Sequence, residues 1–117
     1  MWAAASSRAQ GTASANIPQA RPVLVWLTAV TNGDQDQLKT VFSESMRQQF
    51  DQEGWAKVLA TYQDGFRNAF GEYKLEDFRF EYTGGEDAGY VTVTHRGKTM
   101  PALRVVRERT DWKVGER

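Results

Sequence analysis

The 117-residue sequence predicts an α+β fold, in which three N-terminal helices pack on a curved antiparallel sheet of about four strands. Apolar residues recur with a helical period from Pro22 to Phe70, and the period changes to two after Gly71. Glycine or proline also marks most of the segment boundaries. Helices followed by a run of strands are typical of domains in which the helices cover one face of the sheet.

The first helix is predicted to begin at Pro22 and to end at Gly33. Proline suits the first turn of a helix, and the glycine after Asn32 suits a left-handed stop. The residues of its apolar stripe, spaced i, i+3, i+4 and i+7, are Val23, Trp26, Leu27 and Val30.

A second helix is predicted from Asp34 to about Gln49. Asp34 is an N-cap residue, and Gln37 three positions later completes a capping-box pattern. The apolar stripe of this helix is Leu38, Val41, Phe42 and Met46. A third helix is predicted to open at Asp51 or Glu53 and to close at Gly71. Its stripe is Trp55, Val58, Leu59, Tyr62, Phe66 and Phe70.

Four strands are predicted after Gly71, from about residues 78–82, 90–95, 99–109 and 111–116. The segment 84–89 is predicted to be a hairpin loop rather than a phosphate-binding loop, because Glu86 and Asp87 would repel an anion. Arg96-Gly97 is predicted to be a tight turn. Pro101 indicates an edge or a bulge in the third strand.

The balance of charge excludes the usual electrostatic basis for binding nucleic acid. Lys plus Arg and Asp plus Glu both total 15, so the formal net charge is zero. The charges are segregated, with 12 acidic against 6 basic residues in 34–87 and 7 basic against 3 acidic residues in 96–117. We favour mutual neutralisation of acidic helices and basic strands over a basic sheet face for an acidic partner.

Composition sets further limits. The absence of cysteine excludes disulfides and thiolate chemistry. The longest apolar run, 23–27, is far shorter than the ~20 residues of a membrane span, so none is expected. Residues 1–21 are rich in Ala and Ser, without the apolar core of a secretory signal, and are predicted to be a disordered leader or linker. Residues 22–117 form the predicted domain.

The chain resembles the nuclear-transport-factor-2-like superfamily, also called ketosteroid-isomerase-like or cystatin-like. The resemblance is carried by a short helix ending in Asn32-Gly33-Asp34, the run Leu38-Lys-Thr-Val-Phe-Ser43, a long aromatic helix, and strands closing on Trp112-Lys-Val114. It covers Pro22 to Arg117 and is nearest to small bacterial domains of unknown function that are often exported or lipid-anchored. It implies a cone-shaped fold with an interior pocket, and it suggests the cell envelope or periplasm. It implies no particular reaction, because the superfamily holds enzymes, adaptors and association domains.

Two residues are candidates for acid–base chemistry, His95 and Asp77. His95, the only histidine, is predicted at the inner face of a strand end. It could act as an acid or base in a pocket, or it could have a purely local structural role. We favour the structural role. A ketosteroid-isomerase-type site needs a carboxylate base opposite a tyrosine and a protonated acid. Since spacing pairs no carboxylate with Tyr62 or Tyr82, no catalytic residue is assigned.

The inward aromatic stripes predict either a filled core, which we favour, or the lining of a pocket. The residues expected to line such a pocket are Trp26, Tyr62, Phe66, Phe78, Phe80, Tyr82, Val93, His95 and Trp112. No metal site is predicted, since a single histidine and scattered carboxylates match no ligand spacing, and no cofactor is predicted. The opposite sheet face, with Thr92, Thr94 and Arg104, is expected to support a homodimer.

These observations leave two hypotheses. The favoured one is a non-catalytic domain, in the bacterial cell envelope, that binds a small apolar ligand or a protein partner. The alternative is a small-molecule isomerase or dehydratase with His95 or Asp77 facing a cavity opposite Tyr62 or Tyr82.

Overall fold

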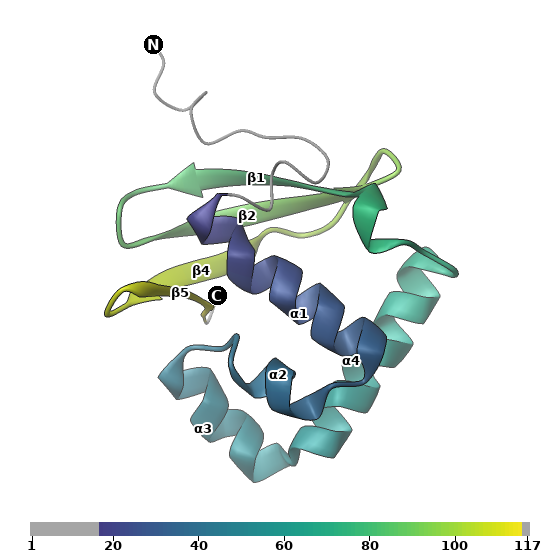
Figure 1. The fold of residues 1–117 in the computed structure, drawn as a ribbon, viewed down its shortest axis with the longest axis horizontal. Helices are drawn as coiled ribbons and strands as arrows, with labels where there is room; N and C mark the ends of the chain where they lie inside the picture. The colour runs from purple at the N-terminus through teal and green to yellow at the C-terminus, as the bar shows by residue number, and fades with distance from the viewer. Residues whose placement is uncertain (1–16, 116–117) are drawn as a thin grey trace.

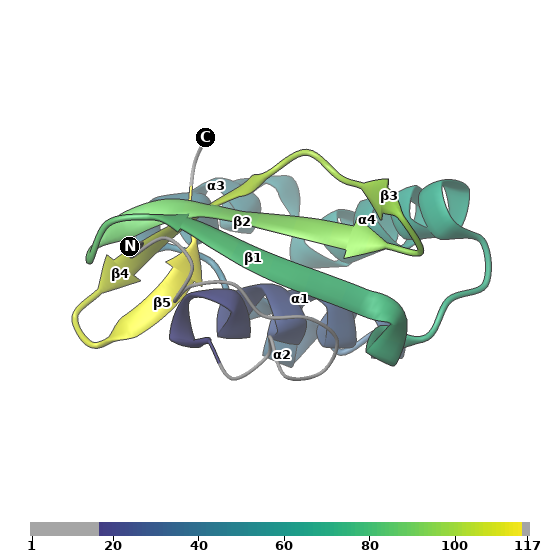
Figure 2. The same ribbon diagram turned by 90° about the horizontal axis from the view of Figure 1, so that it is seen from above.

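The structure, a computed structural model, describes residues 17–115. Within these residues, four α-helices lie on one side of an antiparallel sheet of five strands (Figure 1). The predicted α+β class is confirmed. Viewed from above, β1 and β2 cross over the helical layer, and β4 and β5 continue the sheet beside the start of α1 (Figure 2).

Helix α1 (Arg21–Asn32) forms where the first helix is predicted, and its stripe is buried. Gly33 ends the helix in the left-handed conformation, with φ 67° and its N–H directed to the carbonyls of Ala29 and Val30. A residue with a Cβ atom adopts this conformation at a cost, which explains the glycine. Asp34 then caps α2 (Gln35–Lys39), since its carboxylate accepts a hydrogen bond of 3.0 Å from the N–H of Gln37.

The second predicted helix is divided in two, and this corrects the sequence-based prediction. Helix α2 stops at Lys39, and the segment 41–43 is extended beside the last strand. The N–H of Val114 donates to Val41 (2.7 Å), and the N–H of Ser43 donates to Val114 (2.8 Å). The sheet therefore satisfies the backbone groups that a continuous helix would have satisfied internally. Val41 and Phe42 are buried in the structure. They would also be buried on the apolar stripe of a continuous helix, so the spacing of these residues does not distinguish the extended segment from a helix.

Helix α3 (Glu44–Glu53) is capped by Ser43, whose hydroxyl accepts a hydrogen bond from the N–H of Met46 (3.4 Å). Gly54, with φ 97°, separates α3 from the long helix α4 (Trp55–Phe70). The third predicted helix therefore begins at Trp55, two to four residues later than predicted. Its predicted stripe is buried or half-buried against the other elements.

The strands are β1 (Phe78–Gly84), β2 (Ala88–His95), β3 (Lys98–Thr99), β4 (Leu103–Glu108) and β5 (Asp111–Val114). The order across the sheet is β1-β2-β4-β5, and the short β3 pairs with the end of β2. The third predicted strand is thus interrupted at 100–102. Pro101 explains the interruption, since proline has no N–H to donate to the ladder.

The inner face of the sheet carries the core. The facing pairs are Phe78 with His95, Phe80 with Val93 and Tyr82 with Val91, and all six residues are buried. Burial of each large apolar side chain contributes roughly 1.5–3 kcal/mol. The intervening residues, such as Arg79 and Tyr90, are exposed on the outer face, as the alternation of a half-buried strand requires.

Both ends of the sequence extend past the described residues. Positions 1–16 of the predicted leader and positions 116–117 lie outside them. Residues 18–20 form a short 3-10 helix, η3 (Pro18–Ala20), in which Ala20 is buried, and Arg21 begins α1. Across residues 17–115, no helix has the length and apolar character needed to cross a membrane.

Candidate ligand cavity

An apolar cavity of about 490 Å³ lies between α4 and the β3–β4 connection. Its lining residues come from α1, the segment 41–43, α3, α4, the β3–β4 connection and the sheet. They are Trp26, Phe42, Met46, Thr61, Tyr62, Gly65, Phe66, Ala69, Phe70, Met100, Pro101, Leu103, Arg104, Val114 and Gly115. A comparable hollow between α3 and the β4–β5 turn is lined by charged side chains. The first cavity has the mainly apolar lining and the size typical of small-molecule sites.

Helix α4 forms one wall of the cavity. Its aromatic stripe continues to Phe66 and Phe70, and the ring of Trp26 on α1 meets Tyr62 and Phe66 edge-on, with centroids 5.4 and 4.9 Å away. These contacts hold the rings in place, because edge-to-face pairs of aromatic rings are favourable.

Gly65 leaves open space on the same wall. A Cβ atom added at Gly65 would meet no heavy atom within 4 Å. Glycine within a helix costs about 0.5–1 kcal/mol relative to alanine. Among the described residues, neither a left-handed backbone nor a close neighbour accounts for this glycine. Gly65 is exposed, so this part of the α4 wall is open to a ligand that enters from solvent.

The polar groups bordering the cavity are few. Arg104 is the one charged lining residue among the described residues, and no carboxylate of residues 17–115 forms an ion pair with it. The hydroxyl of Thr61 donates to the carbonyl of Lys57 (2.9 Å) within α4. The indole N–H of Trp26 is buried and has no hydrogen-bond partner in the described part of the chain. Among residues 17–115, no aspartate, glutamate or histidine lines the cavity.

Three of the nine residues predicted to line a pocket border this cavity, namely Trp26, Tyr62 and Phe66. The other six, Phe78, Phe80, Tyr82, Val93, His95 and Trp112, do not border it. Five of these six are buried in the sheet, and Trp112 is half-buried against Tyr82 with ring centroids 5.6 Å apart. The favoured interpretation of a filled core thus describes the strand side chains, whereas the side chains of α4 and α1 border open space.

His95 is enclosed by aromatic rings. Its side chain is 6% exposed, and its ring centroid lies 4.6 Å from that of Phe78 and 4.9 Å from that of Phe70. Nε2 has no hydrogen-bond partner within residues 17–115. Burial lowers the pKa of His95, the positive charge of Arg96 lowers it further, and Asp77 opposes both. These surroundings favour a neutral imidazole away from the cavity.

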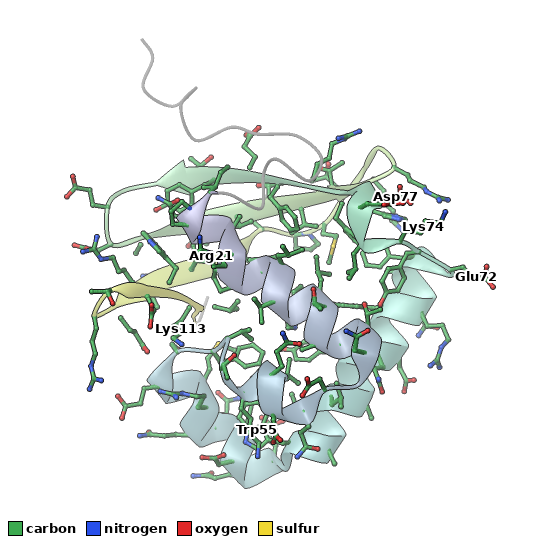
Figure 3. All side chains as sticks on the ribbon, viewed as in Figure 1. Arg21, Trp55, Glu72, Lys74, Asp77 and Lys113 are labelled. Atoms are coloured by element: carbon green, nitrogen blue, oxygen red, sulfur yellow. The ribbon has the colours of Figure 1, made fainter. Side chains whose placement is uncertain are left out.

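Asp77 lies at the periphery of the molecule, where the short 3-10 helix η4 (Leu75–Asp77) leads into β1 (Figure 3). Its carboxylate accepts a hydrogen bond of 3.0 Å from the guanidinium of Arg96, and the two form an ion pair. Asp77 does not border the cavity. The structure therefore brings neither Asp77 nor His95 to the cavity that Tyr62 borders.

Tyr82 is committed to the hairpin at the far end of β1. Its hydroxyl donates to the carbonyl of Gly85 (2.5 Å). Burial raises the pKa of Tyr82, and the negative charge of Asp87 adds to this effect. The ring lies so close to Gly89 that an added Cβ atom there would be 2.5 Å from the tyrosine oxygen. Since β1 advances ~3.3 Å per residue, Tyr82 and Asp77 are separated by roughly 16 Å.

The sequence-based prediction missed most of the wall opposite α4. Met100, Pro101 and Leu103 belong to the interruption between β3 and β4, and Pro101 was the available signal for it. Gly65 was a second signal, since an isolated glycine in a helical pattern often has a packing or functional reason. No group of three or more His, Asp or Glu side chains within residues 17–115 is arranged to hold a metal ion.

Comparison with known proteins supports the fold alone. No protein-family profile and no curated protein matches the chain. A solved structure of a "Putative NTF2-like transpeptidase" from Campylobacter jejuni is similar, with a TM-score of 0.55 and 14% sequence identity over 79% of this chain and 92% of that one. The chain has the nuclear-transport-factor-2-like fold. At this level of identity, the similarity transfers no activity.

Proposed function

We propose that this nuclear-transport-factor-2-like domain is a non-catalytic binding domain that holds a small apolar ligand in the cavity between α4 and the β3–β4 connection. One observation carries the proposal, which is the apolar lining of that cavity without a carboxylate or an imidazole among its described residues. An acid–base enzyme needs such a group within hydrogen-bond reach of its substrate. A binding site needs apolar surface and a few polar groups.

The open space over Gly65 supports the same proposal. A small residue beside an apolar cavity allows a ligand to approach the backbone of α4 closely. Tyr62 and Phe66, which flank Gly65 on the same helix, would then contact the ligand through their rings. Rings of this kind supply large apolar contact areas at low cost in side-chain entropy.

A neutral fluorescent amine, N-phenyl-1-naphthylamine, tests the proposal because its emission rises in an apolar site. The wild-type protein should bind it with a saturable increase in emission. Gly65→Leu fills the open space and should weaken binding at least tenfold. Ala60→Leu adds a larger apolar group at an exposed position of α4 away from the cavity and is the matched control. Equal affinities for wild type and Gly65→Leu would overturn the proposal.

The homodimer is a separate part of the proposal. Tyr90 is 45% exposed on the outer face of β2, on the same face as Thr92 and Thr94. Tyr90 lies on this face between Thr83 of β1 and Arg104 of β4, and an exposed tyrosine beside an arginine is typical of an interface centre. Sedimentation velocity should give a dimer for the wild type and a monomer for Tyr90→Lys, and a monomeric wild type would contradict this part.

The cell envelope stays the predicted compartment.

A further inference from the structure

We infer that the preferred ligand of this cavity is a neutral molecule with fused or linked aromatic rings. The inference rests on the proposed function and adds the chemical class of the ligand. Of the fifteen described residues that line the cavity, five are aromatic and two are methionine, whereas aromatic residues make up 12% of the whole chain. The aliphatic lining residues are fewer, namely Ala69, Pro101, Leu103 and Val114.

The rings beside the cavity already contact one another edge to face. Trp26 meets Tyr62 and Phe66 with interplanar angles of 87° and 89°. Phe70 continues the series from Phe66, with centroids 5.9 Å apart and planes inclined by 67°. Such contacts bring the positive edge of one ring to the negative face of the next. An aromatic ligand extends this series, whereas a saturated ring lacks the charge distribution that the contact needs.

Two methionines border the cavity from different elements. Met46 belongs to α3 and Met100 to the β3–β4 connection, and both are half-buried. A thioether sulfur interacts favourably with aromatic rings, and the unbranched methionine side chain adapts to the outline of a ligand. Both residues therefore favour an aromatic ligand over an aliphatic one of the same size.

The α4 wall includes a strip of small side chains. Thr61, Gly65 and Ala69 border the cavity at intervals of four residues, so they lie on successive turns of the helix. At a rise of about 1.5 Å per residue the strip is about 12 Å long, which accommodates two or three fused aromatic rings. A planar ring system is thinner than its saturated counterpart and can lie closer to this strip.

The charges around the cavity favour a neutral ligand. The register of β4 places Arg104, the one charged residue among the described lining, across from the exposed Tyr90 on the outer face. The next residue, Val105, is buried on the inner face. Among residues 17–115, no carboxylate lines the cavity either. A charged ligand would therefore lose its hydration without gaining a counter-ion inside.

The test compares 2-naphthylmethanol with decahydro-2-naphthylmethanol at pH 7.5 by isothermal titration calorimetry. The two alcohols share a carbon skeleton, and neither ionises at this pH. The saturated alcohol has the larger apolar surface, so burial of apolar surface alone would favour it. Wild type should instead bind the naphthyl alcohol about tenfold more tightly, because each edge-to-face contact strengthens binding roughly two- to tenfold.

Three variants locate the source of this preference. Phe70→Leu removes a lining ring and should reduce the preference to about threefold or less. It should keep its affinity for the saturated alcohol, which also shows that the variant is folded. Met100→Leu removes the sulfur at nearly constant volume and should roughly halve the preference. Phe80→Leu is the control, because it removes a buried ring of β1 that does not border the cavity, and it should behave as wild type.

The outcomes separate the two proposals. If wild type binds both alcohols but prefers the saturated one or shows no preference, the aromatic class is wrong and the apolar site stands. If neither alcohol binds to the wild type, the proposed function falls and the inference falls with it. If Phe80→Leu loses the preference as fully as Phe70→Leu, or if Phe70→Leu and Met100→Leu both keep it in full, the lining does not select aromatic ligands and the inference is wrong.

Discussion

The imidazole of His95 lies against the ring of Phe78, its partner on the neighbouring strand, with the ring centroids 4.6 Å apart. The contact places the only histidine of the chain in the core, where Nε2 has no hydrogen-bond partner within residues 17–115. A charged imidazole in these surroundings would lose its hydration without gaining a buried counter-ion. His95 therefore ties the stability of the fold to pH.

The free energy of unfolding should fall as the pH is lowered through the titration of His95. Its pKa in the folded state lies below the ordinary value of about 6.5, so the unfolded chain takes up the proton first. The contribution of neutral His95 to the free energy of unfolding is fully present above the pKa of the unfolded chain. It decreases as the pH falls, until the pH lies below the pKa of the folded state. The loss is about 1.4 kcal/mol for each unit by which the pKa is lowered.

Urea unfolding at pH 7.5 and pH 5.0 measures this loss. His95→Leu, which keeps an apolar side chain of similar size in the strand, should remove the component of the pH dependence due to His95. A variant with the same loss of stability as the wild type over this range would show that other groups cause it. The carboxylates titrate mainly below this range, which keeps the comparison specific.

Gly89→Ala should destabilise the hairpin by about 3 kcal/mol, as crowding and strain in a packed site do. The added Cβ atom would lie 2.5 Å from the oxygen of Tyr82 and 2.6 Å from the carbonyl oxygen of Thr83. Gly85→Ala is the control, because its nearest neighbour would be 3.9 Å away. Thermal unfolding should separate the two variants clearly, and similar melting temperatures would contradict the close packing of Tyr82.

Ser43→Ala should cost about 1 kcal/mol, the usual effect of losing an N-cap. Ser43 ends the extended segment beside β5 and caps α3 through the N–H of Met46. Gln48→Ala changes an exposed side chain within α3, away from the cap, and should be nearly neutral. If both substitutions have the same effect in urea unfolding, Ser43 does not cap α3.

The helical stripes and the strand alternation predicted the fold class, because burial alone produces both patterns. They could not locate the break at Val41–Ser43, since the same side chains are buried in a helix and in a segment paired with Val114. That choice depends on a backbone partner more than 70 residues away in the sequence. Long-range pairing of this kind leaves no local signal.

The cavity was predictable only on its helical side. Tyr62 and Phe66 follow from the period of α4, whereas Met100 and Pro101 reach the cavity through the interruption between two strands. The sequence placed His95 correctly on the inner face, but the inner face of this sheet is packed rather than open. Which part of a core is filled depends on side-chain volumes across several elements, and periodicity does not report them.

Gly65→Ala should stabilise the protein and weaken ligand binding. Replacing a helical glycine by alanine stabilises a helix by about 0.5–1 kcal/mol, and the added methyl group meets no protein atom within 4 Å. The same methyl group would occupy space that the ligand needs. Thermal unfolding and titration with N-phenyl-1-naphthylamine measure the two effects. A gain in stability without a loss of affinity would place the ligand away from Gly65.

The most direct test of ligand binding between α4 and the β3–β4 connection is the ¹H–¹⁵N spectrum of the indole groups during titration with decanol. Trp26 borders the cavity, whereas Trp55 and Trp112 do not. The Trp26 signal should shift saturably with decanol concentration while the signals of Trp55 and Trp112 remain nearly unchanged. An unchanged Trp26 signal at saturating decanol, or equal shifts of all three signals, would contradict a ligand site at this cavity.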